Sequence, residues 1–249
     1  MQQIYWFFKA NNILKSAKEI FSGFLDLIYP PKCVVCGELN PLSICQNCFS
    51  KFEPIPKPYC RRCGHTLVGS RCRNCSGLKR SFAAGRAAGQ YAGNLREAIC
   101  RFKYNGMRML AEPLSRYMHG YLETQADFRW RQADCIVPVP IHPIRRRLRG
   151  YNQSELLAEH LSRLTGKPLV SDALVRIIHT RPQVELGPEE RRINVRNAFA
   201  VKKRGAIEGK TILLVDDVAT TCSTVDECSI TLLKAGACRV YFLCVAFGA

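Results

Sequence analysis

The feature that most restricts the fold of this chain is a run of four Cys-x-x-Cys pairs near its amino terminus. The last two pairs repeat the first two with an offset of 27 residues (60 − 33), and the match extends to Gly37 and Gly64. Each Cys-x-x-Cys turn directs two thiolates at one ion, so two turns complete a tetrahedral zinc site. An internal duplication of such turns predicts a metal-binding module. The pairs are Cys33/Cys36, Cys45/Cys48, Cys60/Cys63 and Cys72/Cys75.

Two structural zinc ions are expected within residues 29–80. The simplest ligand sets follow the order of the chain, and an interleaved arrangement of the same pairs is the alternative. An iron–sulfur cluster is disfavoured because its cysteines follow other spacings. This segment has few apolar residues and cannot bury much of a core, so zinc would supply the missing folding free energy. The sequential sets are Cys33, Cys36, Cys45 and Cys48 for one ion, and Cys60, Cys63, Cys72 and Cys75 for the other.

The charge of the chain points to an anionic partner. Its 249 residues include 37 Lys and Arg but only 20 Asp and Glu, which gives a formal net charge of +17. Such an excess favours nucleic acid, a phosphorylated metabolite or an anionic membrane surface. Basic side chains near the cysteine pairs either contact nucleic acid or are simply solvated. They are Arg61, Arg62, Arg71, Arg73, Lys79 and Arg80.

Residues 1–28 are predicted to form an amphipathic helix, because Ile13, Ala17, Ile20 and Phe24 recur at helical spacing. The helix would pack on the rest of the protein, and a peripheral membrane contact is the alternative. Its lysines follow the first apolar residues rather than precede them, which is not the pattern of a secretory signal. We therefore expect a cytoplasmic protein, a compartment in which clustered cysteines bind metal more often than they form disulfides.

Residues 81–249 alternate between apolar, strand-like runs and amphipathic helical runs. This alternation predicts an α/β domain with a mainly parallel sheet and helices on both faces. Between residues 171 and 201 the chain is polar and rich in arginine, which is typical of a flap over a site. The expected strands span residues 81–91, 134–139, 211–215 and 239–247, and the expected helices span residues 95–103, 109–123, 152–165 and 224–235.

A candidate phosphate site follows the apolar run at 211–215. Asp216 and Asp217 end this run, and a loop rich in hydroxyl groups leads from them into the next helix. Loops at the carboxyl ends of parallel strands face the ligand crevice, and the free amides of a helix amino terminus favour a phosphate. The acids repel phosphate, so ribose hydroxyls or a Mg²⁺ ion would suit them. The predicted ligand loop comprises Ala219, Thr220, Thr221, Cys222, Ser223 and Thr224.

Four arginines follow the predicted strand at 134–139. No acid occurs between Asp134 and Glu155, and the sequence Pro-Val-Pro (138–140) forces an irregular loop after that strand. Guanidinium groups bind pyrophosphate through paired hydrogen bonds, and they also follow a nucleic-acid backbone. A solvated helix face is the alternative. The arginines are Arg145, Arg146, Arg147 and Arg149.

The segment 211–224 resembles the phosphoribosyl pyrophosphate (PRPP) signature of type I phosphoribosyltransferases, in which four apolar residues and two acids precede a Thr-Thr-Gly-like loop. The resemblance implies that Asp216 and Asp217 bind the ribose hydroxyls and that residues 219–224 surround the 5-phosphate. It further implies that the arginine stretch holds the pyrophosphate, with Mg²⁺ as a cofactor. The family usually carries glycine where this chain has Cys222, and a side chain there crowds the loop.

The motifs as a set resemble one narrower family. The double cysteine module, Pro-Val-Pro-Ile-His (138–142), Arg-Gly-Tyr-Asn-Gln (149–153), Thr-Arg-Pro-Gln (180–183) and the Asp-Asp loop occur in this order. This combination is similar to the ComF (ComFC, GntX-like) family of competence proteins. The resemblance implies a flap that excludes water from an oxocarbenium-like transition state. It also implies that Arg181, Asp216 and Asp217 are the catalytic residues. The implied flap residues are Arg176, Thr180, Arg181, Gln183, Arg192 and Asn194.

Membership would imply a protein that handles incoming single-stranded DNA in natural transformation, beside the DNA-uptake helicase, on a scaffold that binds PRPP. One alternative is an active Mg²⁺-dependent phosphoribosyltransferase with an unknown acceptor. Another is a scaffold that joins the uptake machinery through the amino-terminal helix and the zinc module. The expected domains are a helix at 1–28, a double zinc ribbon at 29–80, and a phosphoribosyltransferase-like α/β domain at 81–249.

Overall fold

The structure, a computed structural model, describes residues 30–180 and 187–248. The predicted helix at 1–28, the predicted catalytic residue Arg181 and the flap residue Gln183 lie outside the described residues. The chain divides into two compact units, one up to Cys48 and the other from Phe49 onward. The first unit therefore contains the first two cysteine pairs, and the second contains the other two pairs and the α/β domain.

In the first unit, the chain from Pro30 to Cys48 turns around its cysteines. Gly37 has φ +79 and its amide donates to the carbonyl of Cys33 at 2.9 Å, which closes the first Cys-x-x-Cys turn. Glycine adopts this left-handed conformation without a steric penalty. The short helix α2 (Gln46–Ser50) begins within the second pair. The turn and the helix start present their sulfur atoms to the same point.

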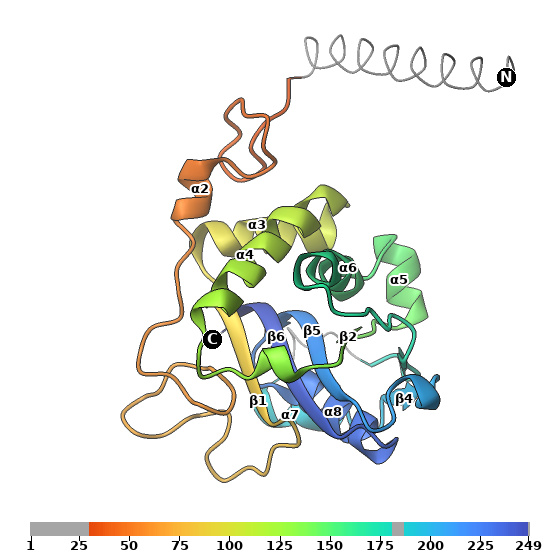
Figure 1. Ribbon diagram of the computed structural model, residues 1–249. Coiled ribbons are helices and arrows are strands. Elements are labelled where there is room, and N and C mark those ends of the chain that lie inside the picture. The colour runs from red at the N-terminus through yellow and green to blue at the C-terminus, as the bar shows by residue number, and fades with distance from the viewer. Residues whose placement is uncertain (1–29, 181–186, 249) are drawn as a thin grey trace, which may run out of the picture. The chain divides into compact units, whose positions relative to one another are not determined.

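A parallel sheet forms the centre of the second unit, in the strand order β1–β6–β5–β2 (Figure 1). Every pairing in it is parallel, as predicted. The central strand β6 is buried from Val240 to Phe247, as expected for a strand that is covered on both faces. The strands are β1 (Ala84–Gln90), β2 (Cys135–Pro138), β5 (Thr211–Ala219) and β6 (Arg239–Phe247).

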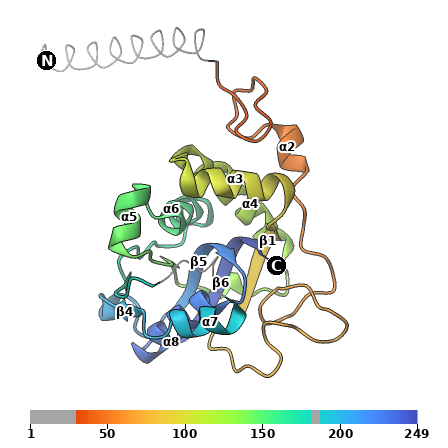
Figure 2. The same ribbon diagram turned by 180° about the vertical axis from the view of Figure 1, so that it is seen from behind.

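Helices cover both faces of this sheet (Figures 1 and 2). On one face lie α3 (Gly93–Tyr104), α4 (Ala111–Thr124) and α6 (Gln153–Thr165), and on the other lies α8 (Ser223–Lys234). In α4 the residues Leu114, Met118 and Leu122 recur at helical spacing and are fully buried. The predicted α/β class is confirmed. Shorter helices are η1 (Arg108–Leu110), η2 (Trp130–Gln132), α5 (Pro143–Arg149), α7 (Pro188–Asn194) and η4 (Arg204–Ala206).

Two elements differ from the expected ones. Strand β5 continues past Val215 to Ala219, because its last residues keep pairing with β6, so Asp216 and Asp217 lie in the strand end rather than after it. The arginine stretch lies mainly on the helix α5 rather than in an irregular loop. Pro143 suits the first turn of α5, and the His142 side chain caps it by accepting from the Ile144 amide.

The polar segment predicted as a flap is flanked by a small antiparallel hairpin. Its strands are β3 (Leu174–Arg176) and β4 (Phe199–Val201), with Arg176 opposite Phe199. Neither strand joins the parallel sheet. The hairpin thus holds together the two ends of the flap segment.

The second pair of cysteine turns packs along β1 at the edge of the sheet. The amide of Gly85 in β1 donates to the carbonyl of Arg62 at 2.7 Å, and the amide of Gln90 donates to the carbonyl of Glu53 at 2.8 Å. A Cβ atom at Gly64 would lie 2.8 Å from the carbonyl oxygen of Gly85, so this approach requires glycine. The edge strand is therefore covered rather than left open for pairing with another chain.

Candidate ligand site and metal centres

Each cysteine tetrad gathers its four sulfur atoms within 4.8 Å of one another. The Sγ atoms of Cys36 and Cys45 lie 3.8 Å apart, and those of Cys63 and Cys72 lie 3.5 Å apart. Sulfur atoms about 2.3 Å from a tetrahedral zinc ion lie about 3.8 Å from one another, so both tetrads fit zinc. The cysteines of the two repeats do not mix, which decides for the sequential ligand sets and against the interleaved arrangement.

The predicted phosphate loop connects β5 to α8 and turns at Cys222. This residue has φ +59, a left-handed conformation that costs a residue with a side chain about 1–2 kcal/mol. Its side chain is only 3% exposed. The hollow lined by Asp216 and residues 218–225 has a volume of about 10 Å³, which is no more than a single water molecule needs. The loop would therefore have to widen to take a phosphate.

The second zinc tetrad and the phosphate loop are joined by direct hydrogen bonds. Asn74, between Cys72 and Cys75, donates from Nδ2 to the carbonyl of Thr220 at 2.6 Å. The guanidinium of Arg80 donates to the carbonyl of Thr221 at 2.9 Å. The Cys63 thiol donates a hydrogen bond to the Cys222 side chain, which raises the pKa of Cys63. The zinc module thus holds the backbone of the loop from behind.

Arg80, one of the basic residues near the cysteine pairs, is neither solvated nor available to contact nucleic acid. It is 5% exposed, forms an ion pair with Asp226 at 3.2 Å, and donates to the carbonyl of Asn74. Removing one partner of such a buried pair costs about 3–5 kcal/mol. Arg80 is therefore a structural link between the module and α8. Arg61, Arg71, Arg73 and Lys79 are exposed.

Asp216 and Asp217 lie at the carboxyl end of β5 with a lysine and a serine beside them. Lys103 Nζ pairs with Asp217 Oδ1 at 2.9 Å, and Ser154 Oγ donates to Asp216 Oδ1 at 2.9 Å. Burial, and then the charge of Asp217, raise the pKa of Asp216 to about 7. Burial disfavours the ammonium of Lys103, but the charge and hydrogen bond of Asp217 and the charge of Asp216 together outweigh burial and raise the pKa of Lys103. Lys103 therefore does not fully compensate the negative charge of the two carboxylates, Asp216 and Asp217.

A cavity of about 750 Å³ opens over these two acids. Arg145 and Arg149, one helical turn apart on α5, also line it, together with Arg176 of β3. Arg145 donates to the carbonyl of Thr180 at 2.9 Å, and the guanidinium of Arg149 lies 5.2 Å from the ring centre of Tyr104. Both acids and cations therefore line this cavity, which we call the ligand cavity.

The remaining predicted arginines point elsewhere. Arg146 pairs with Glu155 at 2.9 Å, and Arg147 lines a second cavity. In the flap, Thr180 is buried and accepts from Arg176. Arg191 rather than Arg192 reaches the phosphate loop, where Nη1 donates to Thr220 Oγ1 at 3.0 Å. Arg192 pairs with Glu189 on the same helix.

Three residues of this site carried no signal in the sequence. Lys103 is one of several basic residues in its helix, and Asn74 matches Asn47 in the 27-residue repeat, which gives no indication that it reaches the loop. Ser154 is the nearest to recognisable, because Asn152 before it caps α6 by accepting from the Ser154 amide at 3.2 Å. That cap places the hydroxyl of Ser154 at the first turn of α6, beside Asp216.

The chain is similar to bacterial proteins that are named for competence or DNA utilization. Residues 24–77 match the family model of the double zinc ribbon domain. Competence protein F of Haemophilus influenzae is 31% identical over 212 residues, which cover 82% of this chain and 92% of that protein. This chain belongs to the ComF family. ComF relatives include the DNA utilization protein YhgH of Escherichia coli K12, 31% identical over 225 residues (88% and 98% of the two chains), and Competence protein ComFC of Bacillus subtilis, 27% identical over 200 residues (78% and 79%).

Among solved structures, this ComF protein is similar to a glutamine PRPP amidotransferase of B. subtilis in complex with ADP and GMP. The identity is 20% and the TM-score 0.37, over 55% of this chain and 26% of that chain, so about a quarter of that enzyme is spanned. A purine phosphoribosyltransferase of Pyrococcus horikoshii has 16% identity and a TM-score of 0.30, over 55% and 85% of the two chains. Within the described part of the chain, no helix is long and apolar enough to cross a membrane.

Proposed function

We propose that this ComF protein handles incoming single-stranded DNA during natural transformation and binds PRPP with Mg²⁺ in the ligand cavity. The observation that carries the proposal is the convergence of two acids, the last hydroxyl of the predicted phosphate loop (Thr224) and three arginines on one cavity of about 750 Å³. That volume lies within the range of small-molecule sites. The names of the relatives, which refer to competence and DNA utilization, support the role in DNA uptake.

The chemistry of the ligand cavity suits a phosphorylated sugar. The carboxylates of Asp216 and Asp217 would accept hydrogen bonds from the ribose hydroxyls. These bonds would stabilise the ionised form of Asp216, which burial and the charge of Asp217 disfavour. Thr220, Thr221 and the amides at the start of α8 would surround the 5-phosphate once the loop widens. The guanidiniums of Arg145 and Arg149 would hold the pyrophosphate, and Mg²⁺ would neutralise part of its charge.

Single-stranded DNA suits the charge of the protein. The formal net charge is +17, and Arg147 together with the exposed basic residues of the zinc module adds cations that no acid neutralises in the described ranges. Such cations bind the phosphate backbone with little sequence preference. We further propose that the partner is the DNA-uptake helicase in the cytoplasm, with the amino-terminal helix or the zinc module as the contact.

A second candidate is an active phosphoribosyltransferase. The observation that favours it is that two acids and three arginines line the same cavity, which would accommodate a ribose together with a pyrophosphate leaving group. The cationic arginines would stabilise the departing pyrophosphate. Release of pyrophosphate from PRPP, followed with a pool of nitrogenous acceptors, separates this function from simple binding.

Binding of a fluorescent oligothymidylate, followed by anisotropy at several salt concentrations, tests the DNA proposal. We expect affinity to fall steeply with salt and to fall about tenfold or more in the double variant Arg145→Glu, Arg149→Glu. Arg116→Glu is the matched control, because Arg116 is exposed on α4, pairs with Glu112 at 3.0 Å and does not line the ligand cavity. Absent or salt-insensitive binding by the wild type would refute the proposal.

A further inference from the structure

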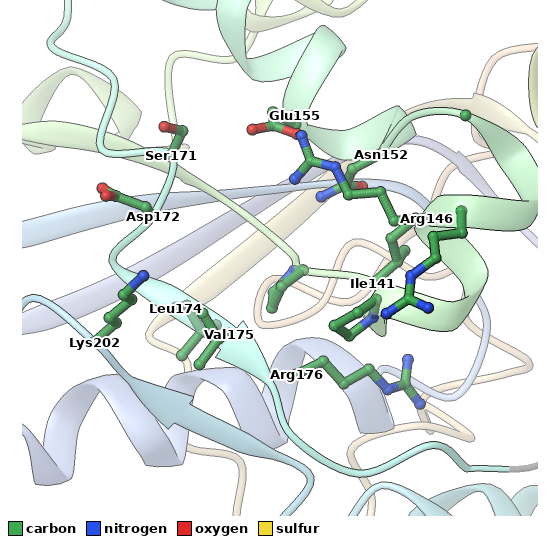
Figure 3. A pocket seen from close by; sticks show the side chains of 14 residues that line it. Ile141, Arg146, Asn152, Glu155, Ser171, Asp172, Leu174, Val175, Arg176 and Lys202 are labelled. Atoms are coloured by element: carbon green, nitrogen blue, oxygen red, sulfur yellow. The ribbon is translucent and has the colours of Figure 1, made fainter.

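The second cavity is lined by Arg146 and Arg147 of α5, whereas Arg145 and Arg149 line the ligand cavity. Figure 3 shows the side chains around the second cavity. It has a volume of about 630 Å³. In Figure 3, Val175 and Lys202 reach it from the β3–β4 hairpin, and Arg146 and Glu155 reach it from α5 and α6. The two cavities share Pro140, Ile141 and Arg176, so one short segment and one side chain separate them. We call it the hairpin cavity.

The hairpin cavity has an excess of positive charge. Its two acids are already engaged: Glu155 pairs with Arg146 at 2.9 Å, and Asp172 pairs with Lys203 at 2.6 Å. Arg147, Lys202 and Arg176 also line it, and none of the three forms an ion pair with a described residue. Four cations and two acids line the cavity, and this excess of positive charge attracts an anion.

Arg176 gives the second, independent indication of a ligand. The residue is only 7% exposed, and its Nε has no hydrogen-bond partner among the residues that the structure describes. Its other contacts are a hydrogen bond to Thr180 Oγ1 and the ring of Phe199, whose centre lies 5.4 Å from the guanidinium carbon. Burial, and then the charge of Arg145, lower the pKa of Arg176. A buried guanidinium without a carboxylate is costly unless an anion completes its surroundings.

The rest of the hairpin cavity is mainly apolar. Pro140, Ile141, Leu174 and Val175 form its wall, and Leu174 is 2% exposed. An inorganic anion would contact only the cations, whereas a ligand with a planar apolar group would also bury this wall. The cavity is large enough for both an anionic group and a planar apolar group. A nucleotide combines the two.

We propose that the hairpin cavity binds a nucleoside monophosphate unit, with its phosphate among Arg147, Arg176 and Lys202 and its base against Ile141 and Val175. The unit is either a free nucleotide or one residue of a single strand, because the two present the same chemistry. The single-strand case rests on the proposed function. A strand bound here would pass directly beside the ligand cavity, since the two share Arg176.

Titration calorimetry with dTMP, and anisotropy with an oligothymidylate, test the proposal on the full chain loaded with zinc. Lys202→Glu is expected to weaken dTMP binding by about tenfold or more, because it removes a charged hydrogen-bond donor and adds a like charge. Val175→Trp, which fills the apolar wall, should weaken it as well. Arg204→Glu is the matched control, since Arg204 is exposed and pairs with Glu208 outside the cavity. Thermal unfolding verifies that each variant is folded.

The outcomes separate this inference from the proposed function. Loss of both dTMP and oligothymidylate binding in Lys202→Glu supports a strand residue in the hairpin cavity. Loss of dTMP binding alone supports a free nucleotide. If Lys202→Glu binds dTMP as the wild type does, the inference is overturned, even where oligothymidylate still binds in a way that depends on Arg145. If neither the wild type nor any variant binds oligothymidylate while dTMP binding depends on Lys202, the proposed function fails and the inference stands.

Discussion

Replacing Asp216 by asparagine is expected to stabilise the protein at alkaline pH while it weakens ligand binding. The Asp216 carboxyl lies beside Asp217, and burial together with that charge raises its pKa to about 7. An asparagine would keep an oxygen that accepts the hydrogen bond from Ser154 Oγ. It would carry no charge, so the repulsion within the pair would disappear.

The magnitude follows from proton linkage. An unfolded aspartate has a pKa of about 3.9, so the folded state binds this proton more tightly than the unfolded state does. The wild type is therefore most stable below the unfolded pKa and loses stability as pH rises toward 7. A separation of about three pKa units corresponds to about 4 kcal/mol at pH 8, and to less than about 2 kcal/mol at pH 5. Those values are upper bounds on the gain from Asp216→Asn.

Urea unfolding followed by circular dichroism, at pH 8 and at pH 5 and with zinc present, measures this gain. For a unit of this size, about 2–3 kcal/mol also raises the melting temperature by about 5–10 °C. PRPP affinity, measured by calorimetry at pH 8, should fall in the same variant. A residue that lowers stability and raises affinity is the expected signature of a ligand group.

The control for this prediction has the opposite sign. A hydrogen bond and ion pair with Lys203 lower the pKa of Asp172, so Asp172→Asn should lose a small amount of stability at neutral pH rather than gain it. The reasoning is refuted if Asp216→Asn destabilises the protein at pH 8. It is equally refuted if the gain in stability is the same at pH 5 as at pH 8, because an effect of packing alone would not depend on pH.

Three further results are expected from the zinc module and the phosphate loop. Asn74→Ala should weaken PRPP binding about fivefold, since the Thr220 carbonyl loses a donor that contributes about 1 kcal/mol; unchanged affinity in calorimetry would contradict the link between the zinc module and the loop. Cys60→Ser should lower the zinc content by one ion and weaken PRPP binding, whereas Cys33→Ser should lower the zinc content equally without changing affinity, as metal analysis and calorimetry on the same samples would verify. Cys222→Gly should raise PRPP affinity, because glycine relieves about 1 kcal/mol of left-handed strain and opens the hollow of the loop; weaker binding would show that the thiol itself holds the loop in its binding form.

Much of the fold could be read from the sequence because its signals are local. The apolar run from Arg239 to Phe247 predicted β6 with the bounds that the structure has. The expected strand at 211–215 was too short, since Asp216 and Asp217 do not look like strand residues. Pairing with β6, which lies far along the chain, keeps them in β5.

The sequence by itself located the two cysteine tetrads and the loop predicted to bind phosphate. Both depend on residues only a few positions apart, whose spacing already limits where their side chains can meet. The tertiary structure alone decided how the arginine stretch is divided. A helix brings residues four apart to one face, so Arg145 and Arg149 line the ligand cavity while Arg146 and Arg147 lie toward the hairpin cavity.

The tertiary structure also decided the surroundings of the two acids and of the loop. Lys103, Ser154 and Asn74 come from three separate segments, and each reaches the carboxylates or the loop backbone only after the helices and the zinc module have packed on the sheet. No spacing in the chain encodes such contacts, because they arise from the burial of apolar faces that lie elsewhere. Local chemistry therefore identified the groups, and long-range packing set their charge and their partners.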